Sequence, residues 1–120
     1  MNKQSVGELG EKLARGFLEK KGYKIIEKNY RCKEGEIDIV AEFKKSLIFV
    51  EVRTKTNNEF GAPEESVDLN KMNKMVNSAF SYLNNHNALS RNWRIDFIGI
   101  ELMTDGKVKR MNHIENAVQF

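Results

Sequence analysis

Two neighbouring segments, residues 36–43 and 46–54, constrain the fold of this chain more than any other part of its sequence. Both alternate in polarity and are rich in Ile, Val and Phe, as β-strands are. Only Lys44 and Lys45 lie between the two segments. The spacing therefore predicts a tight antiparallel hairpin, with one face apolar and the other face charged.

The predicted register brings acidic residues together on the charged face. A turn at residues 44 and 45 opposes residues whose numbers sum to 89, so Asp38 faces Glu51 and Glu36 faces Arg53; a three-residue turn would shift this register by one. Directly opposed carboxylates destabilise a sheet, so something must compensate them. Arg53 and Lys55 could do so in a surface charge network. A divalent cation is the alternative, because Mg²⁺ accepts one or two carboxylates and keeps its remaining waters for substrate phosphates.

The rest of the chain predicts two helices and three more strands. Residues 5–21 have an amphipathic helical pattern, with Ser5 and Glu8 spaced as a capping box and Gly22 as the end. Asp68 could cap a second helix over residues 69–86. Its predicted inward residues are Leu69, Met72, Val76, Ala79, Phe80 and Leu83. Further strands are predicted over residues 23–30, 93–102 and 107–112, and a loop is predicted around residues 60–63. The order α-β-β-β-α-β-β predicts an α/β fold, a mixed sheet flanked by helices.

Length and composition indicate one globular domain spanning residues 1–120. The chain is 40% hydrophobic and 31% charged, which excludes the composition of a disordered protein. Its first thirty residues carry charges throughout and no apolar run, which argues against a signal peptide or a spanning helix. A single cysteine, Cys32, cannot form an internal disulfide. We therefore expect a cytoplasmic protein without membrane association.

Charge is distributed unevenly along the sequence. Residues 1–33 hold nine Lys/Arg and four Asp/Glu, residues 34–68 hold four and nine, and residues 69–120 hold seven and four. The acidic centre between basic flanks suits a cation-binding carboxylate site whose surroundings attract a polyanion. Chance clustering of ordinary surface charge is the alternative interpretation.

Several motifs bear a specific resemblance. Asp38, followed after the hairpin by Glu51-Val52-Arg53, resembles the PD-(D/E)xK signature of restriction-endonuclease-like enzymes. More of the chain is similar to the YraN-like family of uncharacterised small bacterial proteins, which is grouped with Holliday-junction resolvases. The matching stretches are Gly10-Glu11-Lys12-Leu13-Ala14, Gly22-Tyr23, Gly35 to Ala41, Phe49 to Thr54, Phe60-Gly61 and Arg94-Ile95-Asp96. The resemblance implies a restriction-endonuclease-like core.

The resemblance also implies a metal site. It assigns Asp38 and Glu51 as ligands of Mg²⁺ or Mn²⁺, with the main-chain carbonyl of Val52 as a further ligand. Glu11 matches an acidic helix position that approaches the metal in resolvases of this superfamily. An i,i+4 ion pair with Arg15 is the other interpretation of Glu11.

This sequence departs from the motif at its lysine position. Arg53 stands there, and arginine cannot act as a general base because it does not deprotonate in proteins. It can still stabilise charge on a phosphate, and Lys55 on the same strand face is the other candidate. Lys71 and Lys74 lie off the predicted inward stripe of the second helix, where they would either contact phosphates or form a solvated face.

The function implied by the resemblance is a Mg²⁺-dependent DNA endonuclease, and the grouping with resolvases implies selectivity for branched structures. Because a DNA junction has near two-fold symmetry, the resemblance also implies a homodimer. The alternative, favoured by Arg53, is a nucleic-acid-binding module that keeps the nuclease fold without cleavage.

Overall fold

The computed structural model describes residues 2–56, 63 and 67–118. Its elements follow the predicted order α-β-β-β-α-β-β. They are α1 (Lys3–Lys20), β1 (Lys24–Cys32), β2 (Gly35–Phe43), β3 (Ser46–Thr56), α2 (Leu69–Asn85), β4 (Trp93–Leu102) and β5 (Val108–Ile114). The loop predicted around residues 60–63 lies outside the described residues except for Pro63.

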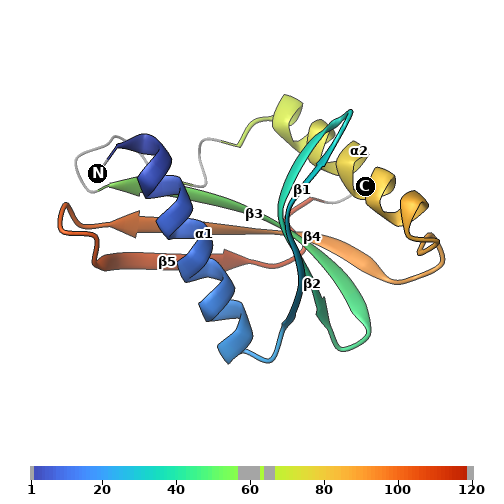
Figure 1. Cartoon of the computed structure of the whole chain (residues 1–120), viewed down its shortest axis with the longest axis horizontal. Helices are drawn as coiled ribbons and strands as arrows, with labels where there is room; N and C mark the ends of the chain where they lie inside the picture. Colours follow the sequence, from blue (N-terminus) through green and yellow to red (C-terminus); the bar gives the residue numbers. More distant parts are fainter. Residues whose placement is uncertain (1, 57–62, 64–66, 119–120) are drawn as a thin grey trace.

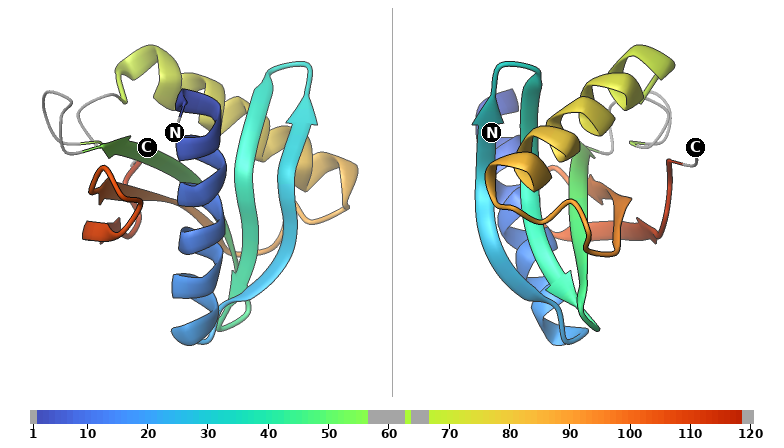
Figure 2. Two further views of the ribbon diagram at one scale, coloured as in Figure 1. Left: turned by 60° about the vertical axis from the view of Figure 1, so that its left-hand side comes forward. Right: turned by 90° about the vertical axis from the view of Figure 1, so that its right-hand side faces the viewer.

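The described strands form one mixed sheet in the order β1-β2-β3-β4-β5. β3 and β4 run parallel and are connected through α2, whereas the other neighbouring strands are antiparallel. Helix α1 packs on one face of the sheet and α2 on the other, as Figure 1 and the two views of Figure 2 show. The result is a three-layer α/β/α arrangement, which agrees with the predicted fold class.

The hairpin between β2 and β3 has the predicted register. Ile39 pairs with Val50 and Phe43 with Ser46, so the residue numbers of each pair sum to 89. Lys44 and Lys45 both have positive φ angles, 49° and 70°. A two-residue turn with both φ values positive matches the right-handed twist of the strands, which fixes the register.

The prediction of one apolar and one charged hairpin face was wrong for the body of the hairpin. Ala41 and Val50 are buried in the core under α1, whereas Val40, Leu47 and Phe49 are buried in the core under α2. Both faces are therefore covered by helices, as in sheets that are buried on both sides. Charged side chains gather on this hairpin where the pairing of β2 and β3 stops.

The N-cap of helix α1 lies three residues before the predicted cap, and the helix begins at Lys3. Its N-cap is Asn2, whose side chain accepts a hydrogen bond from the main-chain N–H of Ser5 at 2.8 Å. The predicted capping box of Ser5 and Glu8 is therefore wrong, because both residues lie inside the helix. Gly22 follows the last turn with φ of 94°, a left-handed conformation that favours glycine, as predicted.

Helix α2 begins as predicted, but it is rotated about its axis relative to the prediction. Asp68 is its N-cap and accepts a hydrogen bond from the main-chain N–H of Lys71 at 2.9 Å. Leu69 and Phe80, predicted to face inward, are 74% and 47% exposed. The buried residues of α2 are Met75, Ser78, Ala79, Tyr82 and Leu83. The polar Ser78 belongs to the buried face, which an apolar periodicity could not reveal.

Candidate functional site

The candidate site lies at a fork where β2 and β3 stop pairing. Regular pairing of the two strands ends at Ile39 and Val50. One step further, Asp38 Oδ2 accepts a hydrogen bond of 2.8 Å from the main-chain N–H of Val52. In a continued ladder that N–H would bond to the main chain of Ile37. The side chain of Asp38 therefore replaces a ladder hydrogen bond, and this fixes its carboxylate at the fork.

A local distortion in β1 and β2 accompanies the fork. Asn29 in β1 has φ of 54°, which is uncommon for a residue within a strand. In β2, Ile37 packs in the α2-side core together with Val40, whereas Ile39 packs in the α1-side core. Regular alternation would put Ile37 and Ile39 on the same face. The strand therefore changes face around Asp38, which frees this side chain to point toward β3.

Glu51 is the second carboxylate of the fork and is almost completely buried. Its exposed fraction is only 4%, yet it forms ion pairs on two sides. Its Oε2 lies 2.9 Å from Nε of Arg53 on the same strand and 3.5 Å from Nζ of Lys71 on α2. Lys71 was predicted only as a phosphate-contacting or solvated residue. The structure brings it into the candidate site, because its long side chain reaches Glu51 from the first turn of α2.

The predicted pairing of Glu36 with Arg53 is not what the structure shows. Glu36 forms an ion pair of 3.6 Å with Arg31 on β1, whereas Arg53 pairs with Glu51. The reason is the fork: β2 and β3 separate before they reach these residues. Among the described residues, the Nε–H of Arg53 has no acceptor in hydrogen-bonding geometry, so its contact with Glu51 is an ion pair without a directed hydrogen bond.

The charged form of Asp38 is disfavoured in this environment. Burial raises the pKa of its carboxyl group, and the neighbouring Glu51 raises it further, to about 7. The Val52 N–H and the charge of Lys71 act in the opposite direction but do not cancel these effects. The predicted proximity of Asp38 and Glu51 is thus present in the structure, together with its predicted electrostatic cost.

Glu11 of α1 approaches the same carboxylates. Burial and the charge of Asp38 raise the pKa of Glu11 to about 7, while Arg15 lowers it. With its amide nitrogen oriented toward the two acids, Asn29 donates to Glu11 Oε1 at 2.9 Å and to Glu36 Oε1 at 3.3 Å. The charges of Asp38 and Arg15 thus both act on Glu11, its approach to a metal stays a prediction, and Asn29 is an additional polar residue of the site.

A close contact between α1 and β3 sets the position of Glu11. Gly10 lies so near Thr54 that a Cβ atom on Gly10 would be 1.8 Å from Thr54 Oγ1. Any side chain at position 10 would push the helix away from the sheet. Glycine at this position therefore lets α1 approach β3 closely and brings Glu11 toward Asp38.

Lys55 and Lys74 occupy different surroundings. Lys55 lines a pocket beside Arg53 and Glu11, between α1 and the end of β3. Lys74 is exposed on α2, where its Cβ lies beside Gly35 at the start of β2. Of the two helix lysines singled out in the sequence, only Lys71 has an ion pair with a carboxylate of the fork.

The fork fits a magnesium-like cation better than a zinc-like one. In the described part of the chain, no three Asp, Glu, His or Cys side chains converge to hold a metal ion by themselves. Asp38 and Glu51 supply two carboxylates, and the carbonyl of Val52 points to the same strand edge as its N–H. Mg²⁺ commonly uses one or two carboxylates and completes its coordination with water, whereas structural zinc needs four protein ligands. Burial and the nearby charge of Glu51 raise the pKa of Asp38, so a cation bound at the fork would favour the charged form of this carboxylate.

A second buried acid, Asp96 of β4, forms a cluster outside the fork. Asp96 is fully buried and accepts hydrogen bonds from Arg94 Nε at 2.9 Å, His113 Nε2 at 2.8 Å and the main-chain N–H of Asn116 at 2.9 Å. Burial alone would raise the pKa of Asp96, but these hydrogen bonds lower it below the ordinary value. Arg94 and Asp96, two residues apart on β4, form an ion pair. The satisfied hydrogen bonds indicate a structural role.

Similarity to known proteins places the chain in a family. The model of a family described as "Uncharacterised protein family UPF0102" matches residues 10–100, which include Glu11, Asp38 and Glu51. The chain belongs to this family. A UPF0102 protein of Caldanaerobacter subterraneus subsp. tengcongensis is 45% identical over 98% of this chain and 97% of its own length. A UPF0102 protein of Clostridioides difficile is 44% identical over 98% of this chain and 99% of its own.

Membership of UPF0102 confirms the predicted relationship to the YraN-like proteins. A third UPF0102 protein, from Geobacter metallireducens, is 38% identical over 99% of this chain and 96% of its own length. These relatives therefore match the chain from one helix to the other and through the whole sheet. None of the described helices is long and apolar enough to cross a membrane.

Proposed function

We propose that this UPF0102 protein is a Mg²⁺- or Mn²⁺-dependent endonuclease that hydrolyses phosphodiester bonds in DNA, with branched DNA as its preferred substrate. One observation carries the proposal: Asp38 and Glu51 meet at the β2–β3 fork with Arg53 and Lys71 beside them. Buried carboxylates that repel each other lower the stability of the folded protein. With cationic side chains beside them, they are suited to bind a metal ion and a phosphate.

The residues of the fork would have separate roles in this reaction. Asp38 and Glu51 would hold the cation with the Val52 carbonyl, and Glu11 would reach it from α1. When bound, a divalent cation stabilises charge on phosphoryl oxygens and makes a water molecule easier to deprotonate. The hydrogen bond from Val52 N–H orients the Asp38 carboxylate, so little reorganisation is needed when the site fills.

Two cations adjoining Glu51 would stabilise the negative charge of the reacting phosphate. Arg53 keeps its charge at every physiological pH and can donate from several N–H groups, but it cannot accept a proton. Lys71 comes from α2, yet its Nζ reaches the same Glu51 oxygen as Arg53 does. We assign to Lys71 the position in space that the motif's lysine would occupy, which compensates for the arginine at position 53.

A second candidate function is nucleic-acid binding without cleavage. The observation that favours it is the 2.9 Å ion pair between Arg53 and Glu51, which neutralises a proposed metal ligand from within the protein. In this alternative, the fork carries only structural charge. DNA would then bind through the basic residues of the flanks.

The remaining parts of the proposal come from the nature of the substrate. A four-way junction has near two-fold symmetry, so two copies of the chain would place one fork on each of two opposed strands. We accordingly propose a homodimer as the cleaving form. A cytoplasmic location completes the proposal, since DNA is the substrate.

The test is cleavage of labelled four-way junctions, flapped duplexes and linear duplexes with Mg²⁺ or Mn²⁺. The parent protein should cut the branched substrates and be inactive in EDTA. Glu51→Gln should abolish cleavage, because it removes a ligand charge without changing the shape of the side chain. Glu42→Gln is the matched control: Glu42 lies at the other end of β2, where it pairs with Arg91, and its loss should leave cleavage unchanged.

Cleavage by the Glu51→Gln variant at the parent's rate would refute the assigned site. If the parent binds branched DNA but cuts no substrate with either metal, the binding-module function takes the place of the nuclease.

A further inference from the structure

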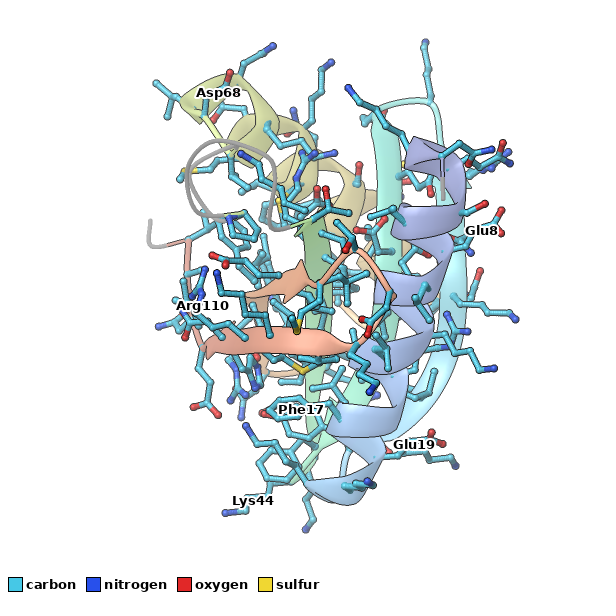
Figure 3. The ribbon with its side chains drawn as sticks, turned by 90° about the vertical axis from the view of Figure 1, so that its left-hand side faces the viewer. Glu8, Phe17, Glu19, Lys44, Asp68 and Arg110 are labelled. Carbon is cyan, nitrogen blue, oxygen red and sulfur yellow. The ribbon has the colours of Figure 1, made fainter. Side chains whose placement is uncertain are left out.

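A pocket of about 390 Å³ lies between the first turns of α1 and the last residues of β3. Its volume is within the range of small-ligand sites. The lining residues are Lys3, Val6, Gly7, Glu11, Val52, Arg53, Thr54 and Lys55. Glu11, Val52 and Arg53 belong to both the pocket and the fork, so the pocket opens beside the proposed metal ligands. Figure 3 shows this end of the molecule, with Glu8 on α1 and Asp68 on α2 at its upper edge and Lys44 at the opposite end.

The charge of the pocket wall favours an anion. Among the described residues, three cationic side chains, Lys3, Arg53 and Lys55, line it together with one carboxylate, Glu11. A pocket with such a lining attracts phosphate groups, which bind both to lysine and to the planar guanidinium of arginine.

Gly7 leaves part of the pocket wall without a side chain. Glycine inside a helix lowers helix stability relative to alanine, so it needs a reason. For Gly10 the reason is the contact with Thr54, but among the described residues no atom beyond the neighbouring turns of α1 lies within 4 Å of a Cβ atom on Gly7. Packing against the described part of the chain therefore does not require glycine at position 7. Since Gly7 lines the pocket, the missing side chain leaves the helix main chain open to close approach by a bound group.

We propose that this pocket is a phosphate subsite, which holds the backbone phosphate next to the one positioned at the fork. The identity of the strand as a nucleic acid rests on the proposed function, whereas the affinity for phosphate rests on the pocket alone. The subsite defines the substrate class: a strand with consecutive phosphates fills the pocket and the fork together. A mononucleotide fills only one of them and is a poor substrate.

The structure supplies a matched pair of glycines for the test. Gly16 lies in the same helix, and a Cβ atom there would also have no other atom within 4 Å. It faces a different, mainly apolar pocket that includes Leu13 and Met111. Gly7→Ala and Gly16→Ala should both raise the melting temperature, because alanine favours the helix. Only Gly7→Ala should weaken DNA binding, by about threefold or more, and Gly7→Leu should weaken it further by filling the pocket.

Binding is measured by fluorescence anisotropy of labelled branched and single-stranded DNA in EDTA, so that the result does not depend on cleavage. Lys3→Ala should also flatten the slope of log affinity against log salt by about one unit. Lys44→Ala is the control lysine, because it lies on the β2–β3 turn at the far end of the molecule. Replacing single DNA phosphates by neutral methylphosphonates should weaken binding of DNA to the parent. At one of the replaced positions, the loss of affinity should be smaller for the Lys3→Ala variant than for the parent.

The outcomes separate the subsite from the nuclease function. If the parent never cuts DNA but the Gly7 and Lys3 variants bind more weakly than their controls, the subsite stands and the nuclease proposal fails. If the parent cuts DNA and these variants bind and cut as it does, the nuclease stands and the subsite is refuted. If DNA does not bind at all, inorganic phosphate replaces it as the probe in an NMR titration. Shifts of the Gly7 and Thr54 amide signals, absent in Lys3→Ala, would then support the subsite, and unchanged signals would overturn it.

Discussion

Replacing Asp38 by asparagine should stabilise the metal-free protein while removing its response to Mg²⁺. Asparagine keeps the shape of the side chain and an oxygen that can accept the hydrogen bond from Val52 N–H. It removes only the charge, which is buried and faces Glu51. Most substitutions of buried residues destabilise a protein, so a gain in stability would be a distinctive result.

The magnitude follows from the pKa of Asp38, which is raised from 3.8 to about 7. The unfolded chain then ionises at lower pH than the folded protein, so folding stability falls as the pH rises from about 4 to about 7. At about 1.4 kcal/mol per pH unit, the upper limit of this loss is about 4 kcal/mol. Because the carboxyl groups share the effect, we expect the variant to gain ~1–3 kcal/mol at pH 8. That corresponds to an increase of roughly 4–12 °C in melting temperature for a domain of this size.

Thermal unfolding followed by circular dichroism from pH 4.5 to 8.5 provides the assay. In EDTA, the curves of parent and variant should diverge as the pH rises, with the variant more stable. Added Mg²⁺ should raise the melting temperature of the parent and leave that of the variant almost unchanged. Asp105→Asn, in the exposed β4–β5 turn, is the control for loss of one acidic charge. If Asp38→Asn is no more stable than the parent at pH 8 in EDTA, the repulsion inferred at the fork is absent.

Three further substitutions test other parts of the structure. Gly10→Ala should destabilise the protein by ~1–3 kcal/mol in chemical denaturation, because its Cβ atom collides with Thr54; an unchanged or higher stability would refute the close contact. Arg53→Lys should keep the melting temperature of the parent and retain or increase its DNA cleavage, because lysine is the residue of the motif; a lower melting temperature without a change in rate would instead indicate a purely structural ion pair. Asp96→Asn should cost about 3 kcal/mol or more near neutral pH, because it leaves the groups around a buried charge unpaired. The lowered pKa of Asp96 makes its contribution present above pH ~4 and lost below it, so the deficit of the variant should shrink as acid is added; a deficit that does not depend on pH would contradict this.

Local sequence signals determined much of the fold. The two lysines of the β2–β3 turn and the alternation on both sides of it were enough to predict the register, because a two-residue turn permits one pairing. Asp68 marked the start of α2 for a similarly local reason. The burial of the two hairpin faces could not be predicted in this way. The alternation of β2 and β3 did not reveal that α2 covers the side carrying Phe49. Burial on both faces depends on which helix packs there, and that is decided by the whole chain.

The sequence predicted the two carboxylates of the candidate site, but it did not predict the residues that surround them. Asp38 and Glu51 could be brought together from the sequence because one hairpin carries both. Lys71 reaches Glu51 from a helix that begins well after β3, a contact that no local spacing indicates. Asn29 gave one weak signal, since asparagine tolerates a positive φ within a strand better than most residues. His113 is buried against Asp96 from the neighbouring strand, so its role also depends on tertiary pairing.

Calorimetric titration of the metal-free protein with Mg²⁺ and Mn²⁺ shows directly whether Asp38 and Glu51 form a divalent-cation site. We expect saturable binding to the parent, with protons released near pH 6 as the ion displaces them from the carboxyl groups. Asp38→Ala should lose this binding, whereas Asp105→Ala should retain it. Equal affinity in parent and Asp38→Ala, or an absence of saturable binding in the parent with either ion, would contradict the claim.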